Sequence, residues 1–261
     1  MMDESEKKYL QDIRDGLVDD AEIADLIKHI LSEGKNVALT SDVNENVIIS
    51  PDGMTYQGDT DDSSKPSGQG VLIFPNGDRI VGEFKDGFAH GSVKYLFTTG
   101  RIYNGVFQNG KPHGKGVLIL ENGARYEGSF TNSNLIDLDG SMILTSPNGD
   151  RYEGEFKDGE LNGRGRVTFL SGWTYEGEFK DNMPIKANMK TPTGDRYEGE
   201  FKDIKPHGQG LMIFRDGRKY EGEFKGGLAH GQGVMTLRDG RKYEGKFKDG
   251  APLQEYNAEK L

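Results

Sequence analysis

One short motif recurs at a nearly constant spacing, and this limits what the chain can fold into. A tyrosine, or once an isoleucine, is followed two positions later by glycine in nine places, namely Tyr56-Gly58, Ile80-Gly82, Tyr103-Gly105, Tyr126-Gly128, Tyr152-Gly154, Tyr175-Gly177, Tyr197-Gly199, Tyr220-Gly222 and Tyr243-Gly245. The steps between successive glycines are 24, 23, 23, 26, 23, 22, 23 and 23 residues. Such a period is typical of a repeat architecture. The decapeptide GDRYEGEFKD, present at 149–158 and 194–203, is therefore a repeated structural unit and not a duplicated active site.

Each repeat is expected to form a β-hairpin. In residues 68–87, GQGVLIFPNGDRIVGEFKDG, a β-rich run ends at Pro75-Asn76-Gly77 and a second run follows. Asn-Gly and Asp-Gly pairs supply the positive φ angles that tight hairpin turns require. A second turn ends most repeats, as at Asp86-Gly87, Asn109-Gly110, Asp158-Gly159 and Asp249-Gly250.

Period-two alternation assigns side chains to two faces of the sheet. Tyr152, Gly154 and Phe156 share one face, whereas Glu153 and Glu155 share the other. Glycine on the aromatic face leaves room for a ring of a neighbouring repeat to lie against bare backbone. The predicted fold class is all-β: an elongated, twisted antiparallel sheet of about nine stacked hairpins.

The pattern Tyr-x-Gly-x-Phe, then Gly, then His-Gly-x-Gly resembles the MORN repeat (membrane occupation and recognition nexus). Its most specific part matches at His113-Gly114-Lys115-Gly116, at 207–210 and at 230–233. The resemblance covers residues 46–250 and implies a curved antiparallel sheet of about nine repeats. It also implies scaffolding, binding of a partner protein, a cytoskeletal or ciliary location and, in some members, phosphoinositide contact. Some members carry a kinase or methyltransferase domain, for which too few residues remain here.

The two ends of the chain differ from the repeats. Residues 1–34 contain ten acids and four bases, so they carry −6 of the net charge of −10. Apolar residues at helical spacing predict a short α-helical segment within residues 1–36. Covering the edge of the first hairpin, binding a partner and mediating a homodimer all remain open for it. Residues 251–261 are expected to form a tail that caps the other end.

Composition disfavours several functions. The net charge is −10 and no basic face is visible, which argues against nucleic acid and anionic membranes as partners. Cysteine is absent, so disulfides and thiolate metal sites are excluded. The polar N-terminus lacks the apolar run of a signal peptide, and no 18-residue apolar stretch occurs. A cytoplasmic location is expected.

No constellation typical of catalysis or metal binding emerges. Four histidines recur at one repeat position, about 10 Å or more apart, which is too far to share a zinc ion: His90, His113, His207 and His230. The Glu pairs of YEGE recur on the open face, where nothing separates their pKa values. Asp59, Asp61 and Asp62 lack the spacing of a calcium loop. We expect no enzyme, no cofactor and no metal.

The most informative positions are those where the repeat is broken. The fourth repeat has a longer loop, SFTNSNLIDLDG, and the sixth replaces His-Gly-x-Gly by MPIKANMK. The only tryptophan occupies a turn position and is typical of an interface anchor. The predicted protein-binding residues are Trp173, Leu135, Ile136, Leu138, Met183, Ile185 and Met189. Neutral drift with local self-packing is the alternative.

These observations favour a non-enzymatic interaction scaffold. Its partner is expected to be a helical or extended segment of another protein, bound along the half-apolar groove of the sheet. One alternative is a peripheral membrane adaptor that binds phosphoinositide lipids, which a basic cluster would favour. Another is a regulatory subunit of an enzyme complex.

Overall fold

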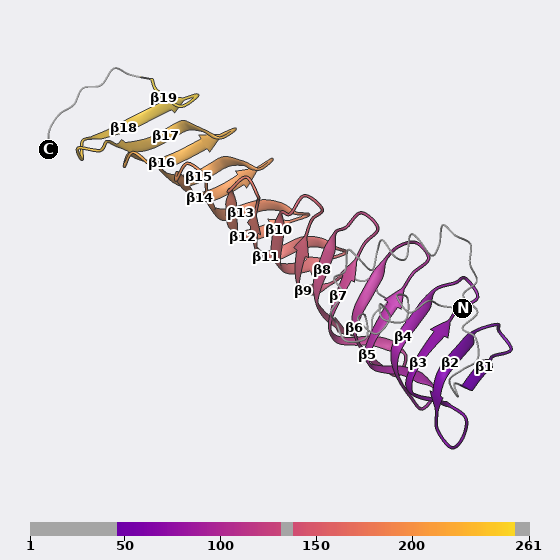
Figure 1. The fold of residues 1–261 in the computed structure, drawn as a ribbon. Helices are drawn as coiled ribbons and strands as arrows, with labels where there is room; N and C mark the ends of the chain where they lie inside the picture. The colour runs from indigo at the N-terminus through magenta and orange to yellow at the C-terminus, as the bar shows by residue number, and fades with distance from the viewer. Residues whose placement is uncertain (1–45, 132–137, 254–261) are drawn as a thin grey trace. The chain divides into compact units, whose positions relative to one another are not determined.

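The computed structural model describes residues 46–131 and 138–253, coloured in Figure 1. The chain divides into two compact units, residues 1–113 with 118–121 and residues 114–117 with 122–261. The described residues form 19 β-strands and no helix, so nothing in them spans a membrane as a helix. The predicted helical segment 1–36 and residues 254–261 of the predicted tail lie outside the described residues.

The first unit is built from antiparallel strands that pair in sequence order. Its strands are β1 (Asn46–Ile49), β2 (Thr55–Thr60), β3 (Pro66–Ile73), β4 (Arg79–Lys85), β5 (Phe88–Leu96), β6 (Ile102–Gln108) and part of β7 (Lys111–Ile119). β2 and β3 form the first complete repeat, and β4 and β5 the second.

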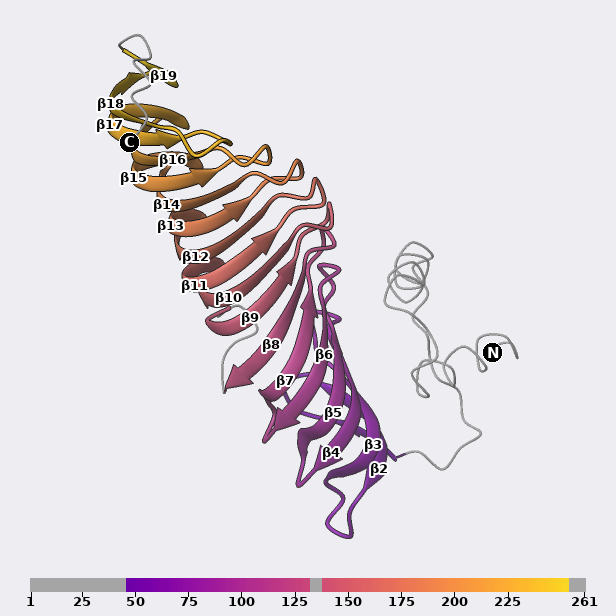
Figure 2. The same ribbon diagram turned by 90° about the vertical axis from the view of Figure 1, so that its left-hand side faces the viewer.

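The second unit continues the same pattern, as Figure 2 shows from the side. Its strands are β8 (Arg125–Thr131), β9 (Gly140–Thr145), β10 (Arg151–Lys157), β11 (Glu160–Thr168), β12 (Thr174–Lys180), β13 (Met183–Lys190), β14 (Arg196–Lys202), β15 (Lys205–Ile213), β16 (Lys219–Lys225), β17 (Leu228–Thr236), β18 (Lys242–Lys248) and β19 (Ala251–Pro252). From β8 to β19, each strand pairs antiparallel with the strand that follows it in sequence. The predicted all-β stack of antiparallel hairpins is confirmed.

When a repeat is counted from its Tyr-x-Gly or Ile-x-Gly strand, a two-residue turn joins that strand to the next in seven repeats. Both turn residues have positive φ, as hairpin turns of this length require, at Asp86-Gly87, Asn109-Gly110, Asp158-Gly159, Asp181-Asn182, Asp203-Ile204, Gly226-Gly227 and Asp249-Gly250. The four turns of this kind predicted from sequence are therefore confirmed. The second residue is usually glycine, because it reaches the left-handed region without steric cost.

A column of glycines makes room for the tyrosines. In the seventh repeat Tyr197 pairs with Met212, and Gly199 pairs with Gly210. A Cβ on Gly210 would lie 2.4 Å from the Tyr197 hydroxyl, so no larger residue fits there. The Tyr197 hydroxyl donates a hydrogen bond to the Glu200 carbonyl at 2.9 Å. A ring therefore packs against bare backbone as predicted, although the ring and the glycine belong to the same repeat and not to neighbouring ones.

Alternating tyrosine and phenylalanine rings form the core of the aromatic face. The Tyr of one repeat meets the Phe of the next edge to face, in the pairs Tyr56–Phe84, Tyr126–Phe156, Tyr175–Phe201, Tyr197–Phe224 and Tyr220–Phe247, with ring centroids 4.7 to 6.3 Å apart. Each such pair contributes roughly 0.5–1.5 kcal/mol beyond its buried area. This column joins successive hairpins within each unit.

Candidate protein-binding surfaces

The polar face of the second unit carries a groove across strands β10 to β14. Its volume is about 630 Å³. Side chains of both signs line it, with the small residues of the glycine column between them: Glu153, Gly154, Arg164, Gly165, Arg166, Glu176, Gly177, Glu178, Lys186, Ala187, Asn188, Glu198 and Gly199. A second hollow of about 380 Å³ extends to β15. The two share Glu176, Asn188 and Glu198, so they adjoin.

Strand β13 supplies the residues that make this part of the face different. It is the strand of the unusual stretch MPIKANMK, and its register shifts between Glu178 and Phe179, opposite Ile185. Asn188 stands opposite Glu176 and Glu198, where Leu211 stands between glutamates in the next repeat. The departure from the repeat therefore replaces an aliphatic position by an amide in the middle of the groove.

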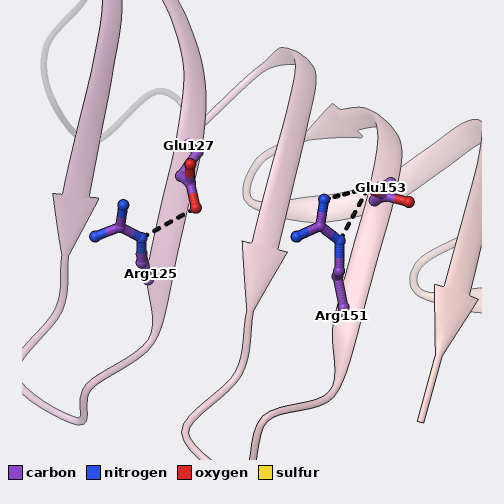
Figure 3. A network of polar contacts seen from close by, with 4 residues as sticks. All are labelled: Arg125, Glu127, Arg151 and Glu153. Atoms are coloured by element: carbon purple, nitrogen blue, oxygen red, sulfur yellow. Dashed lines mark hydrogen bonds and ion pairs between the residues drawn. The ribbon is translucent and has the colours of Figure 1, made fainter.

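Ion pairs order the polar face at and beside the groove. Arg125 Nε lies 3.0 Å from Glu127 Oε1, and the same arrangement returns one repeat later, with Arg151 Nε 2.9 Å from Glu153 Oε1 (Figure 3). Across strands, Arg166 Nη1 lies 4.0 Å from Glu176 Oε2. All these side chains are partly exposed, so each pair contributes at most about 1 kcal/mol. They place groups of opposite sign next to each other on this face.

Reactive groups do not converge in the described part of the chain. In residues 46–131 and 138–253, no group of three His, Asp or Glu side chains is placed to hold a metal ion. The aspartates of the DTDDSS stretch serve the backbone, since Asp61 Oδ1 accepts the amides of Ser63 and Lys65, and Asp59 accepts that of Gln69. The backbone of a recurring histidine also has a structural role, since the carbonyl of His230 accepts a hydrogen bond from the Tyr220 hydroxyl at 3.1 Å.

The structure separates the residues predicted for one binding patch. Leu135 and Ile136 lie outside the described residues. Leu138 is only 8% exposed and packs beside Gly159, so its side chain is not at the surface. Met189 is only 6% exposed because its side chain joins the aromatic face opposite Tyr175.

The remaining predicted residues lie at opposite edges of the sheet. Met183 and Ile185 are both 45% exposed, near the Asp181-Asn182 turn. Trp173 lies before the other end of β12, whose seven residues span roughly 20 Å. The residues therefore do not form one surface. Sequence reasoning also did not select Arg166 or Asn188, although polar residues at positions that are aliphatic in other repeats were a usable signal.

A connecting turn joins each repeat to the next, and Trp173 is partly buried in the one between β11 and β12. Its ring stacks on Tyr175 at 6.4 Å with 14° between the planes, which attaches it to the aromatic column. In three other turns this position holds aspartate, and in two of them Asp150 Oδ1 accepts the Leu170 amide at 2.9 Å and Asp195 Oδ1 accepts the Arg215 amide at 2.7 Å.

The aspartate at this position accepts the backbone amide of the second residue in the next connecting turn. For position 173 that residue is Pro192, which has no amide hydrogen to donate. An apolar residue at position 173 therefore leaves no donor unsatisfied. Two other turns have an apolar residue at this position and a proline in the next turn: Ala124 with Pro147, and Met54 with Pro75. No amide of the next turn therefore requires an acceptor at position 173.

Paired strands repeating every 22 to 26 residues define a β-hairpin repeat protein. The family model for the MORN repeat matches residues 64–79, 81–100, 103–125, 152–174, 175–184, 197–217 and 220–240. The chain belongs to the MORN-repeat family.

Other comparisons give only distant likenesses. No curated protein sequence matches the chain. Among solved structures, the TCP10 domain of Danio rerio CPAP, in complex with a peptide of STIL, is similar with 16% identity and a TM-score of 0.43, covering 78% of this chain and 84% of that one. The TCP domain of Drosophila melanogaster SAS-4 (dCPAP), with a proline-rich motif of Ana2, has 15% identity and a TM-score of 0.35, covering 82% and 98%. Likenesses at this level say nothing about what this chain binds.

Proposed function

We propose that the protein is a non-enzymatic interaction scaffold that binds an extended segment of a partner protein in the groove of β10 to β15. The observation that carries the proposal is the pair of adjoining hollows, which share Glu176, Asn188 and Glu198. Together they cross six neighbouring strands, at about 4.8 Å per strand. A groove of this length on a rigid sheet suits a peptide segment better than a small molecule.

The lining of the groove indicates the kind of segment. Acids such as Glu176 and Glu178 alternate across strands with bases such as Arg164 and Lys186. A segment with charges of both signs in the complementary order would pair along its length, while one of a single sign would be repelled at half of the positions. We therefore expect specificity from charge order, with affinity that falls as salt increases.

The proposal also includes a location in the cell. Membership of the MORN-repeat family supports a cytoplasmic scaffold associated with the cytoskeleton or a cilium, in line with the expectation from the resemblance. Co-sedimentation of the protein with the cytoskeletal fraction of its native extract tests this part separately, and recovery only in the soluble fraction would contradict it.

The groove itself is tested by site-specific photocrosslinking. A photoreactive residue at position 188, exposed at the centre of the groove, is expected to crosslink one recurrent protein segment from native extract, identified by mass spectrometry. Adding Arg166→Glu and Lys186→Glu reverses two groove charges and should reduce that crosslink about tenfold, because the charge order no longer matches.

The matched control is a photoreactive residue at Asn104, which is also an exposed asparagine on the polar face of a strand but outside the groove. Equal crosslinking of the same segment from both positions, or no effect of the charge reversals, would refute groove binding. Circular dichroism must show unchanged strand content in each variant.

A further inference from the structure

The connecting turns of the second unit carry one outward residue each, in a regular row. We define the tip row as Pro147, Leu170, Pro192, Arg215 and Arg238, the second residue of five successive connecting turns. All five are exposed, Leu170 to 75%. The row lies at the edge of the sheet and is distinct from the groove.

Contacts between turns keep the tip row in order. Each tip residue from Leu170 onward packs against the glycine of the preceding turn. A Cβ on Gly149 would lie 2.9 Å from Leu170, and one on Gly172 would lie 3.4 Å from Pro192. Likewise Gly194 adjoins Arg215 and Gly217 adjoins Arg238, at 3.7 and 3.9 Å from the added atom. The stacking fixes one tip per repeat.

The row changes from apolar to basic along its length. Each of the last two turn segments, Phe214–Lys219 and Leu237–Lys242, has three bases and one acid, a net charge of +2. The acids are already engaged, because Asp216 pairs with Arg218 at 2.8 Å and Asp239 with Arg241 at 2.7 Å. The equivalent segments Ser146–Arg151, Phe169–Thr174 and Thr191–Arg196 are each neutral. A local basic surface thus exists on an acidic protein.

The spacing of the tips matches an extended polypeptide. One repeat contributes two strands about 4.8 Å apart, so successive tips are about 10 Å apart. Three residues of an extended polyproline II segment, at about 3.1 Å each, cover about the same distance and bring every third side chain to the same side. A partner lying along the edge would present every third side chain to a tip.

We propose that the tip row is a second interaction surface, and that it binds an extended, acidic segment of a partner protein. In this segment two apolar residues face Leu170 and Pro192, and two carboxylates three residues apart face Arg215 and Arg238. Trp173 adds apolar surface beside the first part. Charge complementarity favours an acidic protein segment, and the apolar half distinguishes it from a uniformly charged ligand.

Fluorescence anisotropy with the full-length protein tests this proposal. The probe is the labelled peptide LTTLTTETTE, and the comparison peptide LTLTETETTT has the same side chains at two-residue spacing. We expect the first peptide to bind at least about tenfold more tightly at low salt, because only its spacing matches the tips. Arg215→Thr with Arg238→Thr should remove that difference; threonine already occupies this turn position at Thr98.

Lys225→Thr with Lys248→Thr is the matched control, since it removes the same charge from the same hairpins at the other edge of the sheet. It should leave peptide affinity within about twofold. Equal losses in both double variants, equal affinity for the two peptides, or no binding would overturn the proposal. So would stronger binding to phosphatidylserine vesicles that depends on the two arginines. The groove variants Arg166→Glu and Lys186→Glu should not affect this assay, so the two proposals fail independently.

Discussion

Ile204 is a β-branched residue in a backbone conformation that suits glycine. It occupies the second position of a two-residue turn with a φ of +64°, where Asp86-Gly87 and Asp158-Gly159 have glycine. Side chains branched at Cβ clash with the backbone in this region, at a cost of roughly 1–2 kcal/mol. The side chain recovers little of this cost, because it is 44% exposed.

Replacing Ile204 by glycine should therefore stabilise the protein. We expect the free energy of unfolding to rise by about 1 kcal/mol, measured by urea denaturation. Ile204→Asn should give a smaller gain, because asparagine tolerates the left-handed region and Asn182 already occupies the equivalent position at a φ of +65°. A loss of stability in both variants would show that the isoleucine makes a contact worth more than the strain.

At the scale of the element, a hairpin depends on one close contact between a ring and a glycine. Gly233 lies beneath Tyr220, and a Cβ there would stand 2.4 Å from the hydroxyl and 2.5 Å from the ring. The φ of Gly233 is not positive, so the need for glycine comes from the contact and not from the backbone conformation.

Gly233→Ala should consequently destabilise the protein by about 1–3 kcal/mol, the usual range for overpacking. A double-mutant cycle with Tyr220→Ala, followed by urea denaturation, identifies the cause. Once the ring is absent, the same glycine substitution should cost well under half as much. If the cost is unchanged, the contact with Tyr220 is not its origin.

Sequence reasoning succeeded for elements because both periods are local. The steps of about 23 residues and the alternation of Tyr152 and Phe156 with Glu153 were enough to predict hairpins and faces. The site was harder to predict, because it depends on which strands lie opposite each other. The groove needs the register that sets Asn188 between Glu176 and Glu198, and the basic edge needs the turns to stack. The net charge of −10 for the whole sequence concealed that basic edge.

At the scale of the whole molecule, buried tyrosines link stability to alkaline pH. Burial raises the pKa of Tyr103 to about 12. Burial, together with the charge of Glu200, raises that of Tyr197 to about 12 as well, although hydrogen bonds to the backbone partly oppose this. In the unfolded chain a tyrosine titrates near 10. Between these values the unfolded chain binds fewer protons than the folded one, so stability falls as pH rises.

We therefore expect the free energy of unfolding to be fully retained below about pH 10 and to decline steadily toward about pH 12. Urea titrations followed by circular dichroism at several pH values measure this decline. Tyr103→Phe with Tyr197→Phe removes two ionisable groups and should make the curve less steep. An equally steep decline in that variant would assign the effect to other groups.

The stacked connecting turns have a consequence for how such a chain can acquire new partners. Stability resides in the rings and glycines inside, while the exposed turn residues touch mainly the turn before them. Substitutions in one turn can therefore change which ligand binds there while the hairpins keep their structure. Duplication of one repeat would add a single exposed turn residue to this surface.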